Sequence, residues 1–226
     1  MYYEIVGANT RILGSVHVFP PGTSALPSWV VDAFNWADLI EMEHDKAEFG
    51  ACFLDPHTNE LKPWGALFIK LGQAFGSFPL QPGVEAEFAN ALRASSRPAM
   101  TYLESGHSIG ALIDAVPFAD IAAVGAAMDA AMPEMLANIG ALHSAWERSN
   151  VAALEALQAE SPLGSIPTMR HAFFTARNEN WARTIAARGP SEKRQLLVVG
   201  AMHLVGSDSL LETLSRCGLD ARRVPS

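Results

Sequence analysis

Two segments near opposite ends of the sequence share a short pattern, a glycine followed three residues later by a histidine. They are Gly14-Ser15-Val16-His17 and Gly200-Ala201-Met202-His203. Imidazole can ligate a metal ion or exchange a proton near neutral pH, and glycine lets the backbone turn or approach a neighbour closely. Because each motif follows an apolar run, both histidines are expected at strand ends. We therefore predict that His17 and His203 converge on one polar active site.

The alternative is that both histidines are structural, since a lone histidine at a strand end is more often a hydrogen-bonded residue than a ligand. Two histidines in matching contexts favour a functional role. Ligand crevices form at the carboxyl ends of parallel strands, which is where these two side chains are expected.

Glutamates on two further apolar runs could complete such a site. Glu41 and Glu43, in segment 38–43, share one face because alternate residues of a strand point the same way. A carboxylate in a buried strand is costly unless it is paired or binds a metal. We assign Glu43 to the site, and a half-exposed edge strand is the serious alternative for Glu41. Glu104 ends another apolar run and fits a similar position.

A polar pair near the start of a predicted helix is the remaining candidate. Arg177 could anchor a carboxylate or stabilise an oxyanion, and Asn178 lies beside it. An ordinary surface helix start is an equally good interpretation. His44, Asp45 and Glu85 are further polar candidates of lower weight.

The elements that must position these residues are visible at both ends of the chain. A strand over 11–18, a helix beginning at Ser28 and a strand over 38–43 form a βαβ unit, which favours parallel pairing. The apolar run 195–199 indicates a strand buried on both faces, and a helix and a last short strand at 221–224 follow it.

The middle of the chain is predicted to be mostly helical. Segment 84–95 has the periodicity of an amphipathic helix, and 97–104 is predicted to be a central strand with Pro98 at its entry. From 109 to 157 the sequence is rich in Ala, Leu and Met, with breaks expected at Pro117 and Pro133. This part could cover the site or form a homodimer face, but a packed core is the default for such a stripe.

These elements predict one α/β domain over residues 1–226. Its central sheet is expected to be mostly parallel and built from two pseudo-symmetric strand–GxxH–helix halves, with a large helical insertion at about 109–160.

Composition narrows the class of partner. The formal net charge is −8, so nucleic acid is not expected as a partner. No apolar run is long enough to span a membrane, and no signal peptide is visible. The protein is expected to be soluble, either cytoplasmic or, if a leader has been removed, periplasmic or secreted.

Several familiar catalytic motifs are missing from the sequence. It has no Gly-x-Ser-x-Gly nucleophile elbow, no His-Glu-x-x-His zinc helix and no phosphate-binding glycine-rich loop. The scattered histidines and glutamates leave metal or acid–base chemistry as the natural uses of the site.

The ordered set of motifs resembles the TraB/GumN family, which includes the TIKI proteases and is distantly similar to ChaN and EreA-like proteins. The likeness is carried by Leu13-Gly14-Ser15-Val16-His17-Val18, Leu26-Pro27, Ala37-Asp38, Glu43-x-Asp45, Lys62-Pro63-Trp64, Gly83-Val84-Glu85, Leu103-Glu104, Arg177-Asn178-x-x-Trp181-Ala182 and Val199-Gly200-Ala201-x-His203-Leu204-x-Gly206.

The resemblance implies a metal-dependent hydrolase, with peptide-bond cleavage as its activity. By motif match, His17, Glu43 and His203 would hold a divalent ion such as Mn²⁺, Co²⁺ or Zn²⁺, whose identity stays open. Glu104, Arg177 and Asn178 would line the same pocket, and the last two would bind a peptide or small-molecule substrate.

Two alternatives to this function remain. One is a peptide- or haem-binding regulatory protein on the same scaffold. The other is a metal-independent, esterase-like hydrolase with a histidine as base.

Overall fold

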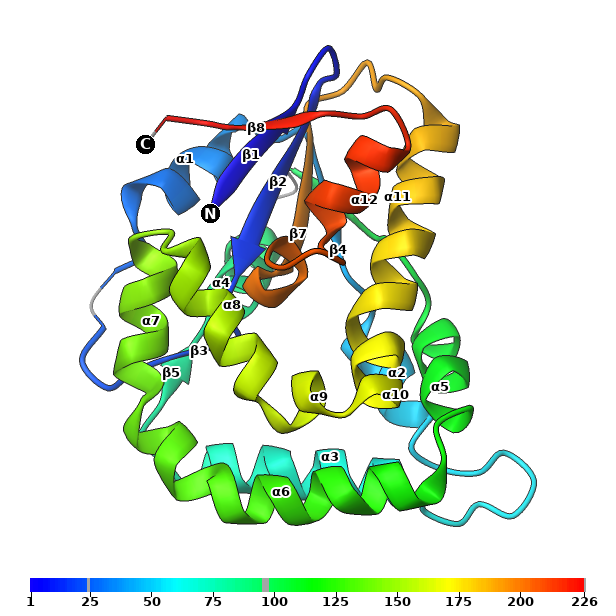
Figure 1. Cartoon of the computed structure of the whole chain (residues 1–226). Helices are drawn as coiled ribbons and strands as arrows, with labels where there is room; N and C mark the ends of the chain where they lie inside the picture. The colour runs from blue at the N-terminus through cyan, green and yellow to red at the C-terminus, as the bar shows by residue number, and fades with distance from the viewer. Residues whose placement is uncertain (24, 95–97, 226) are drawn as a thin grey trace.

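The computed structural model of the protein describes residues 1–23, 25–94 and 98–225. Within these residues, the centre of the fold is a six-stranded sheet in the order β6-β4-β7-β2-β1-β8 (Figure 1). The strands are β1 (Tyr2–Ile5), β2 (Thr10–Ser15), β4 (Leu39–Met42), β6 (Ala99–Tyr102), β7 (Gln195–Gly200) and β8 (Ala221–Arg223). The first four in the sheet order are mutually parallel, whereas β1 and β8 pair antiparallel. The prediction of an α/β fold with a mostly parallel sheet is confirmed.

Strand β7 is an interior strand from the C-terminal part of the chain, and its two neighbours come from the N-terminal part. Leu196, Leu197, Val198 and Val199 are all buried, as expected for a strand covered on both faces. It pairs with β2 on one side and with β4 on the other. The two strands of the predicted βαβ unit, β2 and β4, are therefore not neighbours in the sheet, because β7 lies between them.

Two details of the predicted strands are wrong. Strand β6 is at the edge of the sheet rather than at its centre, because β4 is its one partner among the described strands. Strand β4 is interior, so Glu41 does not lie on a wet edge. Its side chain is buried, and it accepts hydrogen bonds from Arg188 Nη1 at 2.7 Å and from Gln195 Nε2 at 2.7 Å. Ser95 of the predicted helix and Arg97 of the predicted strand lie outside the described residues.

Helices make up most of the rest of the described chain. They are α1 (Ser28–Trp36), α2 (Lys46–Ala51), α3 (Pro63–Gly76), α4 (Val84–Ala94), α5 (Gly106–Asp114), α6 (Phe118–Ala137), α7 (Ile139–Glu147), α8 (Val151–Glu160), α9 (Pro162–Ser165), α10 (Pro167–Arg170), a π-helix (His171–Thr175), α11 (Ala176–Arg188), a 3₁₀ helix (Ala201–Leu204) and α12 (Leu210–Arg216).

The helical middle contains the predicted insertion at about 109–160 and the helix predicted near Arg177. It begins at Gly106 and continues, with short breaks, to Arg188. Pro117 does separate two helices, but Pro133 lies inside α6 and does not end it. A proline inside a helix removes one hydrogen bond to the carbonyl four residues earlier, so it can bend a helix without ending it.

Two hydrophobic clusters stabilise the fold. One surrounds the sheet, and the other lies among α3, α5, α6 and the π-helix, with Trp64 and Ile113 among its buried members. Figure 1 shows α3 and α6 side by side, away from the sheet. Among the described residues no single helix is long and apolar enough to cross a membrane; α5 and α6 pass that test only as a pair bent by 103°.

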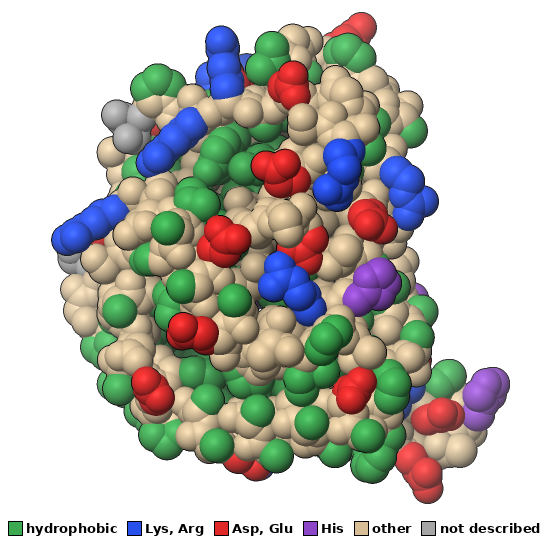
Figure 2. Space-filling model, viewed as in Figure 1, with side chains coloured by type: hydrophobic (Ala, Val, Ile, Leu, Met, Phe, Trp, Pro, Cys, Tyr) green, Lys and Arg blue, Asp and Glu red, His purple; other side chains and the backbone are tan. Residues whose placement is uncertain are grey.

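On the face viewed in Figure 2, acidic and basic side chains are interspersed.

The ion pair of Glu41 predicts a specific effect on stability. Arg188→Ala should lower the free energy of unfolding by about 1–3 kcal/mol, because it leaves the buried Glu41 carboxylate without its cation. Urea denaturation measures this loss. Adding Glu41→Leu to the same protein should recover most of it, and failure to recover would show that the guanidinium acts through packing instead.

Candidate functional site

The site forms where the carboxyl ends of the parallel strands β2, β4 and β7 lie side by side. Ser15 at the end of β2 lies opposite Gly200 at the end of β7, and Glu43 directly follows β4. The Gly200 N–H donates a hydrogen bond to Glu43 Oε1 at 2.5 Å. A Cβ on residue 200 would lie 3.3 Å from that oxygen, so glycine leaves room for the carboxylate.

A buried arginine connects this edge to α11. Arg177 donates from Nη2 to Glu43 Oε2 at 2.7 Å and from Nε to Glu104 Oε1 at 2.6 Å. Its guanidinium also lies 4.7 Å from the ring centroid of Trp181. Burial would raise the pKa of Glu43, but the charge of Arg177, with smaller contributions from the histidines, holds it well below its usual range. Burial raises the pKa of Glu104 despite the same arginine.

His203 is held in its neutral form inside the same network. Asn178 donates from Nδ2 to the Asp208 carbonyl, so its Oδ1 accepts from His203 Nδ1 at 2.7 Å. Arg177 Nη1 lies 3.3 Å from His203 Nε2 and donates to it. Burial lowers the pKa of His203 to about 3, which Glu43 only partly opposes. His203 therefore stays uncharged at neutral pH.

His17 is in the opposite situation. Its side chain is 65% exposed, and Nδ1 lies 3.0 Å from Glu85 Oε1, which also accepts from Ser15 Oγ at 2.5 Å. The carboxylate of Glu85 raises the pKa of His17 to about 9, against a smaller opposing effect of desolvation. Although burial of Glu85 works the other way, its contacts with His17 and Ser15 lower its pKa to about 2. His17 and Glu85 are thus a charged pair at neutral pH.

Gly83 is the residue that brings Glu85 to His17. The N–H groups of Gly83 and Val84 donate to the carbonyls of His17 and Val16, both at 3.0 Å, so the chain entering α4 lies directly on the segment after β2. A Cβ on residue 83 would be 2.0 Å from the Val16 carbonyl oxygen. Only glycine permits this approach, and it places Glu85 in the first turn of α4.

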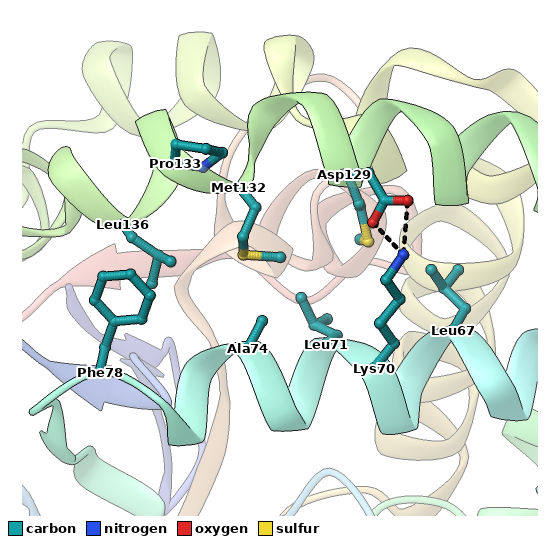
Figure 3. Close-up of a pocket in the computed structure, with 10 residues that line it drawn as sticks. Leu67, Lys70, Leu71, Ala74, Phe78, Asp129, Met132, Pro133 and Leu136 are labelled. Atoms are coloured by element: carbon teal, nitrogen blue, oxygen red, sulfur yellow. Dashed lines mark hydrogen bonds and ion pairs between the residues drawn. The ribbon is translucent and has the colours of Figure 1, made fainter.

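An open cleft of about 350 Å³ adjoins these groups. It lies between α4 and the ends of β4 and β6, and its lining residues are His17, Met42, Glu43, His44, Asp45, Lys46, Glu85, Ala86, Ala89, Asn90, Arg93, Met100, Tyr102 and Val198. A second pocket of similar size lies between α3 and α6 (Figure 3). Its lining is mostly apolar, with an ion pair between Lys70 and Asp129, so it offers no comparable acid–base chemistry.

The predicted metal ligands do not fit a metal ion in this arrangement. Glu43 Oε2 and His203 Nε2 are both engaged by Arg177, whose positive charge already compensates the carboxylate. His17 Nδ1 is engaged by Glu85. Among the described residues, no three His, Cys, Asp or Glu side chains are disposed to hold a metal ion together.

The structure therefore brings all six predicted site residues to one edge of the sheet, in two sets. Arg177 connects Glu43, Glu104 and His203, and Asn178 orients His203. His17 lies apart from this set and contacts Glu85. On the sequence alone, Glu85 is only a minor candidate for the site. The sequence signal for Glu85 is Gly83, two residues earlier, because a glycine at a helix start can mark a close approach of the backbone.

Comparison with known proteins yields one match. The model of the TraB/PrgY/gumN family matches residues 52–223, which is 172 of the 226 residues. This range contains Glu85, Glu104, Arg177, Asn178 and His203 and begins after His17 and Glu43. No curated protein and no solved structure matches.

The close approach at Gly83 predicts a large effect of one methyl group. Gly83→Ala should destabilise the fold by about 1–3 kcal/mol, because the new Cβ would overlap the backbone of Val16 and His17. Gly72→Ala is the matched control. Gly72 lies inside α3 with open space around it, so that change should be neutral or stabilising in a thermal melt. Equal effects of the two changes would contradict the assigned role of Gly83.

The pair of His17 and Glu85 predicts a pH-dependent stability. Because the folded pKa of His17 is raised above its unfolded value near 6.5, the stabilisation is complete below about pH 6.5 and is lost as the pH rises through about 9. Glu85→Gln should lower the His17 pKa in an NMR titration. The stability advantage of the parent protein over this variant should shrink between pH 6 and 10, and an unchanged pKa would disprove the pairing.

Proposed function

The chain belongs to the TraB/PrgY/gumN family, and on that premise we propose that it is a hydrolase whose general base is His17. The observation that carries the proposal is the contact between His17 Nδ1 and Glu85 Oε1 at 3.0 Å on the wall of an open cleft. A histidine that is exposed to a cleft and oriented by a carboxylate is the arrangement that general-base catalysis requires.

Each side chain then has a defined task. As the pH rises through about 9, His17 loses the proton on Nε2 and keeps its Nδ1–H, which it donates to Glu85. The free Nε2 lone pair then takes a proton from water as the water attacks an ester or amide carbonyl. The same proton can pass to the leaving group. Lys46 lines the cleft and its charge acts on His17, so it supplies positive charge near the developing oxyanion. Arg177 and Asn178 act indirectly, since their polar groups position Glu43 and His203.

A metal-dependent peptidase is the competing form of the same proposal. Its support is the ligand chemistry, since histidine nitrogen and glutamate oxygen suit Zn²⁺, Mn²⁺ or Co²⁺. It requires Glu43 and His203 to release Arg177. That the two GxxH halves act as one pseudo-symmetric site stays a prediction, as does a purely binding role for a peptide or a haem.

The acid–base proposal predicts a pH–rate profile. After EDTA treatment the protein should hydrolyse 4-nitrophenyl butyrate with a kcat/KM that rises with pH until His17 is deprotonated. His17→Ala should lower kcat/KM by about 10²–10⁴-fold. Glu85→Gln should move the rising limb to lower pH, because it removes the carboxylate that raises the pKa of His17.

His57→Ala is the control, since His57 is exposed on a turn distant in sequence from the site. It should leave the profile unchanged. Added Mn²⁺, Co²⁺ or Zn²⁺ should alter neither the rate nor the melting temperature. Activity that appears only with one of these ions and is lost in His203→Ala would support the metal-dependent peptidase instead, and a Soret band on titration with haem would support binding.

A further inference from the structure

The cleft beside His17 has a shape and charge distribution that select a class of ligand. Its helical wall is one face of α4, formed by Ala86, Ala89, Asn90 and Arg93 at the spacing of successive turns. Two alanines on this face leave space above the sheet. Glu85 stands at the start of the same helix, next to His17.

The opposite wall is an apolar strip on the sheet. Met42 lies opposite Tyr102 on the neighbouring strand, and Met100 lies two residues before Tyr102, so the three side chains are on the same face. Val198, opposite Met42 on β7, extends the strip toward the centre of the sheet. An extended apolar segment could lie along this strip and against the alanines.

Arg93 marks the end of the cleft that is remote from His17. Arg93 follows Glu85 by eight positions in the helix, a rise of about 12 Å along the axis. The helix leads into β6, which runs parallel to β4, so α4 ends near the opposite edge of the sheet from His17. Within the described part of the chain, the Arg93 side chain is exposed and bonds only to Asn90 Oδ1, with no carboxylate partner.

Resting on the proposed hydrolase activity, we propose that this cleft binds a substrate with an extended apolar segment that ends in an anionic group. The scissile carbonyl lies at His17, the apolar segment lies between Ala89 and the strip of Met42, Met100 and Tyr102, and the anion pairs with Arg93. The helical span of about 12 Å corresponds to roughly three or four extended peptide residues. Because the Arg93 guanidinium is directed back toward Asn90, one turn nearer to His17, a shorter acyl chain can also reach it.

The test compares two ligands that differ only in the anion. Octanamide carries a carbonyl and an apolar chain, and octanedioic acid monoamide adds a carboxylate at the far end. Binding is measured by calorimetry on the full-length His17→Ala protein, which has lost the proposed base and cannot turn the amides over. Binding can be measured even if the protein hydrolyses nothing. A failure of the proposed ligand class is therefore distinguishable from a failure of the proposed hydrolase activity.

The monoamide should bind more tightly than octanamide, and added salt should reduce the difference. Arg93→Glu should weaken the monoamide about tenfold and change octanamide by less than about twofold. Arg183→Glu is the matched control, because Arg183 is also exposed and bonds to an asparagine three residues earlier, but on α11 outside the cleft. It should change neither affinity.

A second variant tests the apolar segment. Ala89→Leu should weaken both ligands by filling the space over the strip, with a melting temperature close to that of the parent because leucine is a good helix former. The inference is overturned if both amides bind equally, if Arg93→Glu affects both alike, or if Arg183→Glu has the same effect as Arg93→Glu.

Discussion

The buried guanidinium of Arg177 is the interaction on which the carboxyl edge of the sheet depends. It binds one carboxylate at the end of β4 and another at the end of β6, and it donates to the histidine that follows β7. Removing the cation would leave two buried carboxylates uncompensated, which is a costly state. Three segments far apart in the sequence are therefore held in one arrangement by a single side chain from α11.

This arrangement gives the two matching histidines opposite properties. His203 is buried beside a cation, so desolvation and repulsion keep it neutral. His17 is exposed beside a carboxylate, so it holds its proton to a higher pH. Two copies of the Gly-x-x-His pattern thus hold one buried, neutral histidine and one exposed, charged histidine.

The cleft depends on a second constraint, the contact of the chain at Gly83 with the backbone after β2. It fixes the start of α4 and therefore both Glu85 at one end and Arg93 at the other. One helix therefore carries both the carboxylate that contacts the proposed base and the arginine proposed to bind the anion. This makes the cleft, rather than the apolar pocket between α3 and α6, the part of the molecule where function is expected.

Local pattern was enough to identify the α/β class, the strand over 195–199 and the last strand, because apolar periodicity depends on neighbours in the sequence. Strand-end position also pointed to candidate site residues, which the structure brings close together. Membership of the TraB/PrgY/gumN family agrees with the motif order. Which strands are neighbours depended on contacts between distant segments. The insertion of β7 between β2 and β4, the edge position of β6, the burial of Glu41 against Arg188 and the pairing of Glu85 with His17 are all of this kind. Only the tertiary structure decided them, because a hydrogen bond or an ion pair between such residues leaves no periodic signal in the sequence.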